Sequence, residues 1–344
     1  MRRGVITISY DYSTIGDEYK DVAFYYAKDV VDGTRIAGKK VIKACIRHLN
    51  DLKKINLAPY VYTYVPEKAK NAIDFLEMLP DVKTGKTYPL AMFQKFNIGN
   101  IYGWRKKADT SIRRYKKALI SVARKNGKTI LIAGIVLYEF LFGHNPAMSR
   151  QLFCTANDRT QARIAWTMAK KQLEALRAKD ADIRKATKVM RDELTNKLDE
   201  SYIRALSRDT GAVDGFEPYV GVLDEYAASK TNEMLELLES GQGQLDNPLI
   251  LIISTAGLDL NVPMHTIEYN YVERLLNGEI EDDSYFAYVA EQDSEDEIND
   301  ESTWIKSNPI LEVDSLNEKI IEYLRKRRST SLETGEINKV LVKN

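Results

Sequence analysis

The sequence contains few of the residues that build metal centres and disulfide frameworks. Its 344 residues include two cysteines, Cys45 and Cys154, and three histidines without metal-ligand spacing to them. Two cysteines cannot supply a four-ligand zinc site alone, and they argue against a disulfide-stapled secreted domain. The composition therefore fits a protein of a reducing cytoplasm.

Long apolar runs and an excess of charge of one sign are also missing. The longest apolar run, residues 129 to 142, is too short to span a bilayer, so we interpret it as a buried helix and expect no membrane segment. The 50 basic and 50 acidic residues cancel. The total charge therefore gives no indication of a nucleic-acid partner, and any basic surface must be local.

Apolar periodicity predicts a helical region followed by an α/β domain. In residues 1 to 88, the spacing predicts helices over 19–31, 39–52 and 67–79, and a further helix holds Phe93 to Trp104. From residue 89 to 278 strands and helices alternate, which favours a mainly parallel sheet with helices on both faces. The expected strands are 118–122, 152–155, 203–206, 219–223 and 249–254, and the expected helices are 129–142, 160–176 and 232–238.

Residues 279 to 344 differ in composition. The stretch 279–301 is strongly acidic and is interpreted as a solvated loop, and 316–328 has the pattern of a basic amphipathic helix. We expect this region to serve as a lid and linker rather than as part of the sheet.

The triplet Gly-Lys-Thr occurs twice, at 85–87 and at 127–129. A phosphate-binding loop needs a strand before it and a helix after it, so that backbone N–H groups point at the anion. The first triplet lacks a preceding strand and is soon followed by Pro89, so we interpret it as a turn. The second follows strand 118–122 and opens the apolar helix, which predicts a P-loop NTPase.

The second loop reads Ala123-Arg124-Lys125-Asn126-Gly127-Lys128-Thr129. Lys128 is predicted to neutralise β- and γ-phosphate oxygens of ATP, and Thr129 to ligate Mg²⁺. The usual pattern has a glycine where this chain has Val122. We expect Ala123, one position later, to be small enough for the turn.

Two adjacent acids, Asp224 and Glu225, follow the strand 219–223. Asp224 is predicted to hold Mg²⁺ through water, and Glu225 to orient and deprotonate the attacking water. Such a pair favours a hydrolase over a kinase, because a kinase must exclude water. After the next strand, Ser254 to Gly257 are placed to sense the γ-phosphate.

Local basic clusters indicate a nucleic-acid partner. Residues 105–128 contain ten Lys or Arg and one acid, and Lys326, Arg327 and Arg328 form a second cluster. These side chains can track DNA phosphates without reading sequence, or they can form an ordinary solvated face. Similarly, Arg159 at the start of helix 160–176 either contacts phosphates or belongs to an N-capped helix start.

The combination of SVARKNGKT, VLDEYAASK, STAG and the upstream block PLAMFQKFNIGNIYGW resembles the large terminase subunit of tailed bacteriophages. The resemblance implies that Gln94 reads adenine and that Arg124 is the basic residue of the loop. It matches Lys128 and Thr129 to the Walker A motif and Asp224 and Glu225 to the Walker B motif. The coupling motif is then Ser254, Thr255, Ala256 and Gly257.

The resemblance further implies ATP hydrolysis that drives double-stranded viral DNA into a procapsid. The partners would be a portal protein, a small terminase subunit and further copies of the chain in a ring, within the host cytoplasm. An arginine finger is expected at Arg208, with Arg204 second. Because the chain ends where the family's nuclease domain should begin, we expect nuclease activity to be absent. The alternatives are a helicase-like DNA translocase and a nucleotide-binding docking scaffold.

Overall fold

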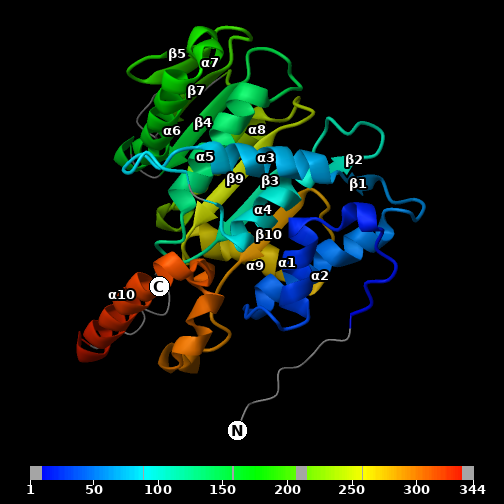
Figure 1. Cartoon of the computed structure of the whole chain (residues 1–344), viewed down its shortest axis with the longest axis vertical. Helices are drawn as coiled ribbons and strands as arrows, with labels where there is room; N and C mark the ends of the chain where they lie inside the picture. The colour runs from blue at the N-terminus through cyan, green and yellow to red at the C-terminus, as the bar shows by residue number, and fades with distance from the viewer. Residues whose placement is uncertain (1–9, 88, 157–158, 207–214, 258, 335–344) are drawn as a thin grey trace.

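An eight-stranded sheet forms the centre of the computed structural model, which describes residues 10–87, 89–156, 159–206, 215–257 and 259–334. The strand order is β10-β3-β9-β8-β4-β7-β6-β5 (Figure 1). Strands β10 to β7 pair in parallel, and β6 and β5 continue the sheet antiparallel. Their bounds are β3 Lys117–Ser121, β4 Gln151–Ala156, β5 Thr187–Val189, β6 Glu193–Asn196, β7 Tyr202–Leu206, β8 Pro218–Asp224, β9 Leu249–Ser254 and β10 Tyr285–Val289. The predicted α/β class is confirmed.

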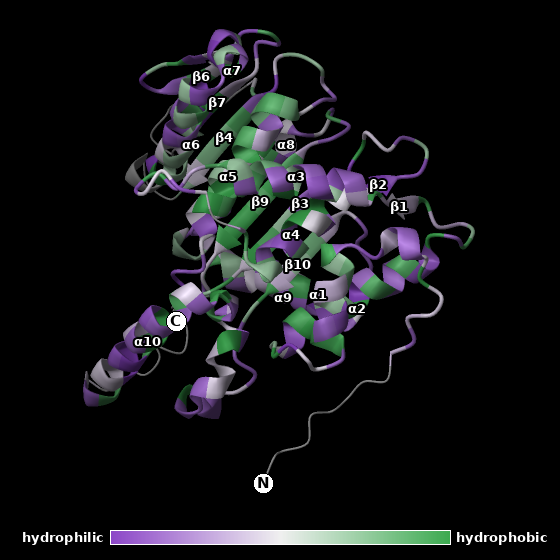
Figure 2. Cartoon of the chain, in the orientation of Figure 1, coloured by the Kyte–Doolittle hydropathy of each residue, from purple (hydrophilic) through white to green (hydrophobic). Residues whose placement is uncertain are grey.

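The central strands are buried on both faces, because alternate side chains enter two different cores. On one face Ile120, Val222 and Leu251 join the larger core with helices α5 (Lys128–Phe142) and α6 (Arg159–Lys179). On the other face Leu119 and Ile252 pack in a second core with α8 (Glu233–Gly241) and α9 (Asn270–Asn277). Figure 2 shows the resulting apolar strands between helices with polar outer surfaces.

The N-terminal helices pack on one another and contact both the edge strand β10 and helix α5. They are α1 (Val22–Val31), α2 (Lys39–Lys54), α3 (Pro66–Met78) and α4 (Met92–Gly103). This region also contains a two-stranded antiparallel ribbon, formed by β1 (Tyr62–Tyr64) and β2 (Trp104–Lys106). Buried Trp104 donates a hydrogen bond from its indole nitrogen to Nδ1 of His48, at 3.1 Å, which ties β2 to α2.

The segment after residue 278 differs from the expected loop. Strand β10 lies within it and pairs along its length with β3, from Tyr285 opposite Lys117 to Val289 opposite Ser121. Short 3-10 turns follow over Glu295–Asn299, Glu301–Lys306 and Pro309–Glu312, and then helix α10, Asp314–Thr334, projects from the sheet domain (Figure 1). The sheet therefore takes an edge strand from the part of the chain expected to hold only loop, lid and linker.

Gly85-Lys86-Thr87 lies in a loop closed by Asp81, whose backbone N–H donates to the carbonyl of Lys86 at 2.8 Å. The turn expected at this triplet is present. Within the described ranges, no helix combines the length and apolar character needed to cross a lipid bilayer.

Candidate active site

The predicted phosphate and metal residues meet at the end of the sheet where its parallel strands finish. Strands β3, β9 and β8 are parallel neighbours, so their carboxyl ends lie together. A cavity of about 580 Å³ opens there, and its walls include Lys128, Thr129, Asp224, Glu225 and Thr255. Residues separated by more than 120 positions thus share one site through the order of the strands.

The loop between β3 and α5 has the backbone of an anion-binding turn. Gly127, the N-cap of α5, has φ 75°, and Lys125 has φ 72°. A side chain at position 127 would also place its Cβ 2.7 Å from Nε2 of Gln94. Glycine meets both constraints without strain, whereas a larger residue would strain the backbone and displace Gln94. The first N–H groups of α5 lack intrahelical acceptors, which makes this helix end suited to a phosphate.

Lys128 lies between the loop and the acidic pair. Its ammonium donates to the carbonyl oxygens of Val122 and Ala123 at 3.3 and 3.2 Å and lies 3.9 Å from Oε1 of Glu225. Burial lowers the pKa of Lys128, which Glu225 and Asp224 partly oppose. A buried ammonium beside the helix N-terminus is placed to meet further negative charge.

Asp224 is only 9% exposed, and burial raises its pKa to about 6, with the Glu225 charge acting in the same direction and Lys128 against it. Two neighbouring carboxylates therefore share one ammonium, which compensates the ionised form of Asp224 only in part. A divalent cation would supply the remaining compensation. Thr129 and Asp224 both line the cavity, and a hydroxyl and a carboxylate are the oxygen donors that Mg²⁺ prefers, so the lining fits this ion.

The stretch Ser254–Gly257 holds the turn that carries Glu225. Glu225 has φ 53° and donates its N–H to the carbonyl of Ile253 at 2.9 Å. The Thr255 hydroxyl donates to Oε2 of Glu225 at 3.4 Å, and Oγ of buried Ser254 accepts the N–H of Ala227 at 3.0 Å. A displacement of this stretch would therefore move Glu225 directly, although its coupling role stays a prediction.

Gln94 contacts the loop from α4. Its Oε1 accepts the N–H of Ala91 at 3.0 Å, and its Nε2 donates to the carbonyl of Asn126 at 3.5 Å. The side chain is 6% exposed. Gln94 therefore caps its own helix and braces the phosphate loop, while its predicted contact with adenine stays a prediction.

Sequence reasoning missed a second brace, which comes from residues 307–310. Asn126 is 1% exposed; its Oδ1 accepts the N–H of Ile310 at 3.0 Å, and its Nδ2 donates to Oδ1 of Asn308 at 3.2 Å. The N–H of Ala123 donates to the carbonyl of Ser307 at 3.2 Å. No local pattern signals these contacts, because more than 180 residues separate the partners. The phosphate loop is thus fixed to the segment that leads into α10.

The arginine candidates occupy different places. Arg124 is exposed and lines the cavity. Arg204 on β7 is paired with Glu193 at 2.5 Å and is not among the residues that line the cavity. Arg208 and the side chain of Arg159 lie outside the described residues.

The basic run 105–128 does not form one exposed face. Arg105, Arg113 and Arg114 are 4%, 2% and 2% exposed. Arg114 pairs with Asp51 at 2.7 Å, and Lys117 pairs with Glu239 and Glu268 at 2.8 Å each. Much of this charge therefore holds the domain together and is not available to a polyanion.

Comparison with known proteins identifies the family. Residues 92–274 match the model of the terminase large subunit ATPase domain, and residues 279–344 match that of the terminase large subunit endonuclease domain. The "Terminase, large subunit" of Enterobacteria phage HK97 is 28% identical over 71% of this chain and 46% of its own length. "Protein YmfN" of Escherichia coli K12 is 26% identical over 38% of this chain and 28% of its own length. The chain thus spans less than half of these relatives.

The crystal structure of the HK97 bacteriophage large terminase shares the fold, with a TM-score of 0.65 and 22% identity over 80% of this chain and 54% of that one. The expectation that nuclease activity is absent is wrong, because the endonuclease-domain model matches residues 279–344. This match begins in the acidic stretch whose composition suggested only a solvated loop. Since the ATPase-domain model covers more than half of its residues, the chain belongs to the terminase large subunit family.

Proposed function

We propose that the chain hydrolyses ATP at the cavity beside β3, β8 and β9 and uses the energy to package double-stranded viral DNA into a procapsid. The observation that carries the proposal is the meeting of Lys128, Thr129, Asp224 and Glu225 at one cavity, at the end of a helix suited to phosphate. Membership of the terminase large subunit family supports the packaging role.

Each residue has a role that its place supports. The N–H groups at the start of α5 and the Lys128 ammonium bind the β- and γ-phosphates, and Thr129 and Asp224 hold Mg²⁺. The ion neutralises phosphate charge during transfer. Glu225 orients the attacking water and accepts its proton, and Thr255 fixes the Glu225 carboxylate. Gln94 and Arg124 flank the loop as nucleotide-contacting residues, with Lys125, Asn126 and Gly127 forming its turn.

The further components follow from the packaging role. We propose that copies of the chain form a ring with a portal protein and a small terminase subunit in the host cytoplasm. Arg208 remains our candidate for the arginine finger. Arg204 is less suited, because Glu193 already pairs with its guanidinium.

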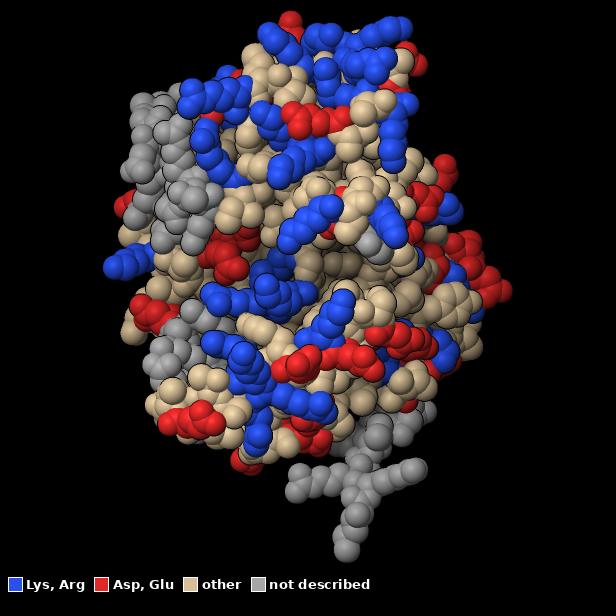
Figure 3. All heavy atoms as spheres, turned by 60° about the vertical axis from the view of Figure 1, so that its left-hand side comes forward, with Lys and Arg blue, Asp and Glu red and all other residues tan. Residues whose placement is uncertain are grey.

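We place the DNA contact at the tip formed by α7 (Ala181–Ala186), β5 and β6. Figure 3 shows lysines and arginines gathered there. The exposed basic residues of this tip and the adjoining end of α6 are Lys171, Lys179, Arg184, Lys185, Lys188, Arg191 and Lys197. Exposed cations suit the backbone of any DNA sequence, whereas three arginines of the run 105–128 are buried and its Lys117 is paired with acids.

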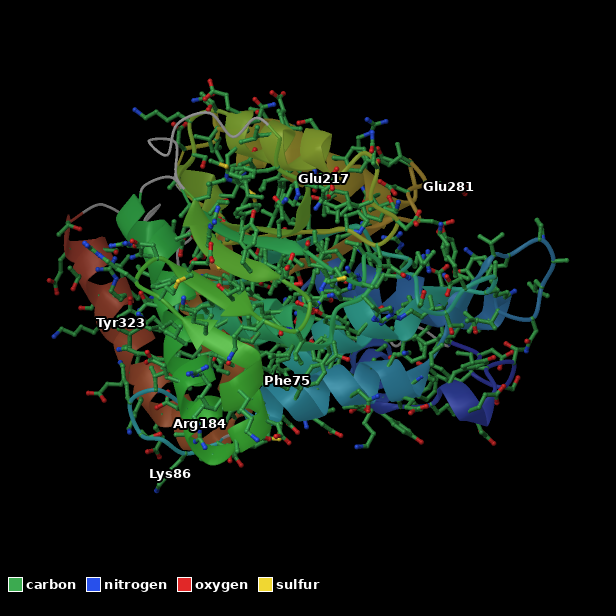
Figure 4. The ribbon with its side chains drawn as sticks, turned by 90° about the horizontal axis from the view of Figure 1, so that it is seen from above. Phe75, Lys86, Arg184, Glu217, Glu281 and Tyr323 are labelled. Atoms are coloured by element: carbon green, nitrogen blue, oxygen red, sulfur yellow. The ribbon has the colours of Figure 1, made fainter. Side chains whose placement is uncertain are left out.

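Phosphate release from Mg·ATP tests the ATPase. Glu225→Gln should slow release by about a hundredfold or more, since it removes the base that activates water, while binding of a fluorescent ATP analogue persists. Glu217→Gln is the matched control, because exposed Glu217 precedes the same strand at its opposite end (Figure 4). Equal rates for Glu225→Gln and wild type would favour the alternative that the chain is a nucleotide-binding docking scaffold.

DNA binding is tested separately from catalysis. Lys185→Glu with Lys188→Glu should weaken binding of a random-sequence duplex and lower its salt dependence, because fewer counterions are released. Lys53→Glu, on the remote helix α2, should leave DNA affinity unchanged. If the tip variant binds DNA as wild type does, the tip is not the DNA surface.

A further inference from the structure

A second cavity, of about 540 Å³, lies at the opposite end of the sheet, near the start of strand β8. The active-site cavity is lined by the start of α5 and the end of β8, whereas this one is lined by Gly143 after α5 and by Tyr219 near the start of β8. Helix α3 and the junction of α4 with β2 complete its walls. The two cavities are therefore separate, and the residues proposed for ATP do not reach the second.

The walls of the second cavity are aromatic. Phe75 of α3 (labelled in Figure 4) and Tyr138 and Phe142 of α5 contact one another, with ring centroids 5.4 to 5.6 Å apart. Phe142 and Met78, both lining residues, are 54% and 56% exposed. Large apolar side chains at the mouth of a cavity offer a surface on which a flat apolar group can pack.

The inner end of the cavity is cationic. Arg113 pairs with Glu139, and the other oxygen of Glu139 accepts the Tyr219 hydroxyl at 2.8 Å. Arg105 is 4% exposed and donates to the carbonyls of Tyr102 and Ser111 at 2.7 and 3.1 Å. In the part of the chain that the structure describes, Arg105 has no carboxylate at ion-pair distance.

Two buried guanidinium groups therefore share one carboxylate, whose oxygens both have partners. Burying a guanidinium without a counter-charge is unfavourable, and carbonyl dipoles compensate it only in part. Guanidinium groups also bind carboxylate and phosphate better than other anions, because their N–H groups match the spacing of the oxygens. Lys68 and Asp74 of α3 also line the cavity and offset each other, so the lining retains one positive charge in excess.

We propose that this cavity binds a small amphipathic anion, namely a flat apolar group that carries one carboxylate or phosphate. The anion meets Arg105 at the inner end, and the apolar group packs against Phe75, Tyr138 and Phe142. The cavity volume lies within the range of small-molecule sites. This site is independent of the proposed ATP hydrolysis.

The experiment titrates the full chain with 2-naphthoate and with 2-naphthyl phosphate, observed by ligand-detected NMR, with neutral 2-naphthamide as the comparison. A dissociation constant of about 1 mM or lower is expected for at least one anion, given the size of the probes. The tighter anion identifies carboxylate or phosphate as the preferred head group. Amide binding as tight as both anions, or no binding of either anion at several-fold higher concentration, overturns the proposal.

Variants locate the binding. Arg105→Gln should weaken binding of the anion about tenfold or more, because it removes a charge-assisted contact. Since Arg105 also supports backbone carbonyls, Phe142→Ala provides a second test at an exposed position, and an unchanged thermal midpoint shows that it folds. Tyr25→Ala, similarly exposed on α1, is the control and should bind as wild type does. Binding that survives Phe142→Ala, or that is displaced by saturating Mg·ATP, refutes the assignment.

Discussion

Asp224→Asn is predicted to raise the stability of the chain at neutral pH in the absence of nucleotide and divalent cations, although it removes a proposed metal ligand. Burial and the neighbouring Glu225 raise the Asp224 pKa from its ordinary value of 3.8 to about 6. The difference of about 2 pKa units corresponds to roughly 3 kcal/mol. This shift already includes the attraction of Lys128, so about 3 kcal/mol is the upper limit, and we expect a gain of about 1–3 kcal/mol.

The direction in which stability changes with pH follows from proton binding. Between pH 3.8 and 6 the unfolded chain releases the Asp224 proton while the folded chain retains it, so stability falls as pH rises through this window and stays lowered above it. Asparagine carries no such proton. The gain from the substitution should therefore be complete at pH 8 and about half as large at pH 5.

Urea unfolding of wild type and Asp224→Asn at both pH values measures this difference. Asp259→Asn, at an exposed position on the rim of the same cavity, is the control and should change stability little at either pH. A loss of stability in Asp224→Asn at pH 8, or a gain that does not depend on pH, would show that the ionised Asp224 carboxylate does not destabilise the folded chain.

Two further substitutions test the supports of the two cavities. Position 127 has a left-handed backbone, and an added Cβ would clash with Gln94, so Gly127→Ala should weaken binding of a fluorescent ATP analogue about tenfold. Equilibrium titration measures this affinity, and an unchanged value would mean that the loop adapts. Glu139→Ala leaves Arg113 buried without its partner and should lower the free energy of unfolding by about 3–5 kcal/mol, and a urea midpoint close to that of wild type would contradict the buried pair.

The sequence predicted the parts of the fold that have strong local patterns. The strand ending at Ser121, the helix from Lys128 and the strand ending at Asp224 lie where their apolar runs indicated. Strand β10 was missed because its short apolar run lies between acidic stretches, and only pairing with β3 makes it a strand. The β5–β6 hairpin was missed because its strands are short and partly polar.

For the site, the sequence predicted which residues gather but not what holds them. The order of parallel strands brings Lys128 beside Glu225, and the motifs already implied this. The contacts of Asn126 with residues 308 and 310 depend on the path of the chain across the domain, which no short pattern encodes. Likewise, a run of cations in sequence does not show that Arg113 and Arg114 turn inward to meet distant carboxylates.

The pairing of β10 with β3 has a mechanical consequence. A pull on the chain beyond Val289 acts along a strand whose hydrogen bonds to β3 run the full length of both, so the bonds share the load in shear and do not open one at a time. The last pair in this register, Val289 with Ser121, adjoins the phosphate loop. Tension on this segment is therefore transmitted through the paired strands β10 and β3 to the loop that we propose binds nucleotide.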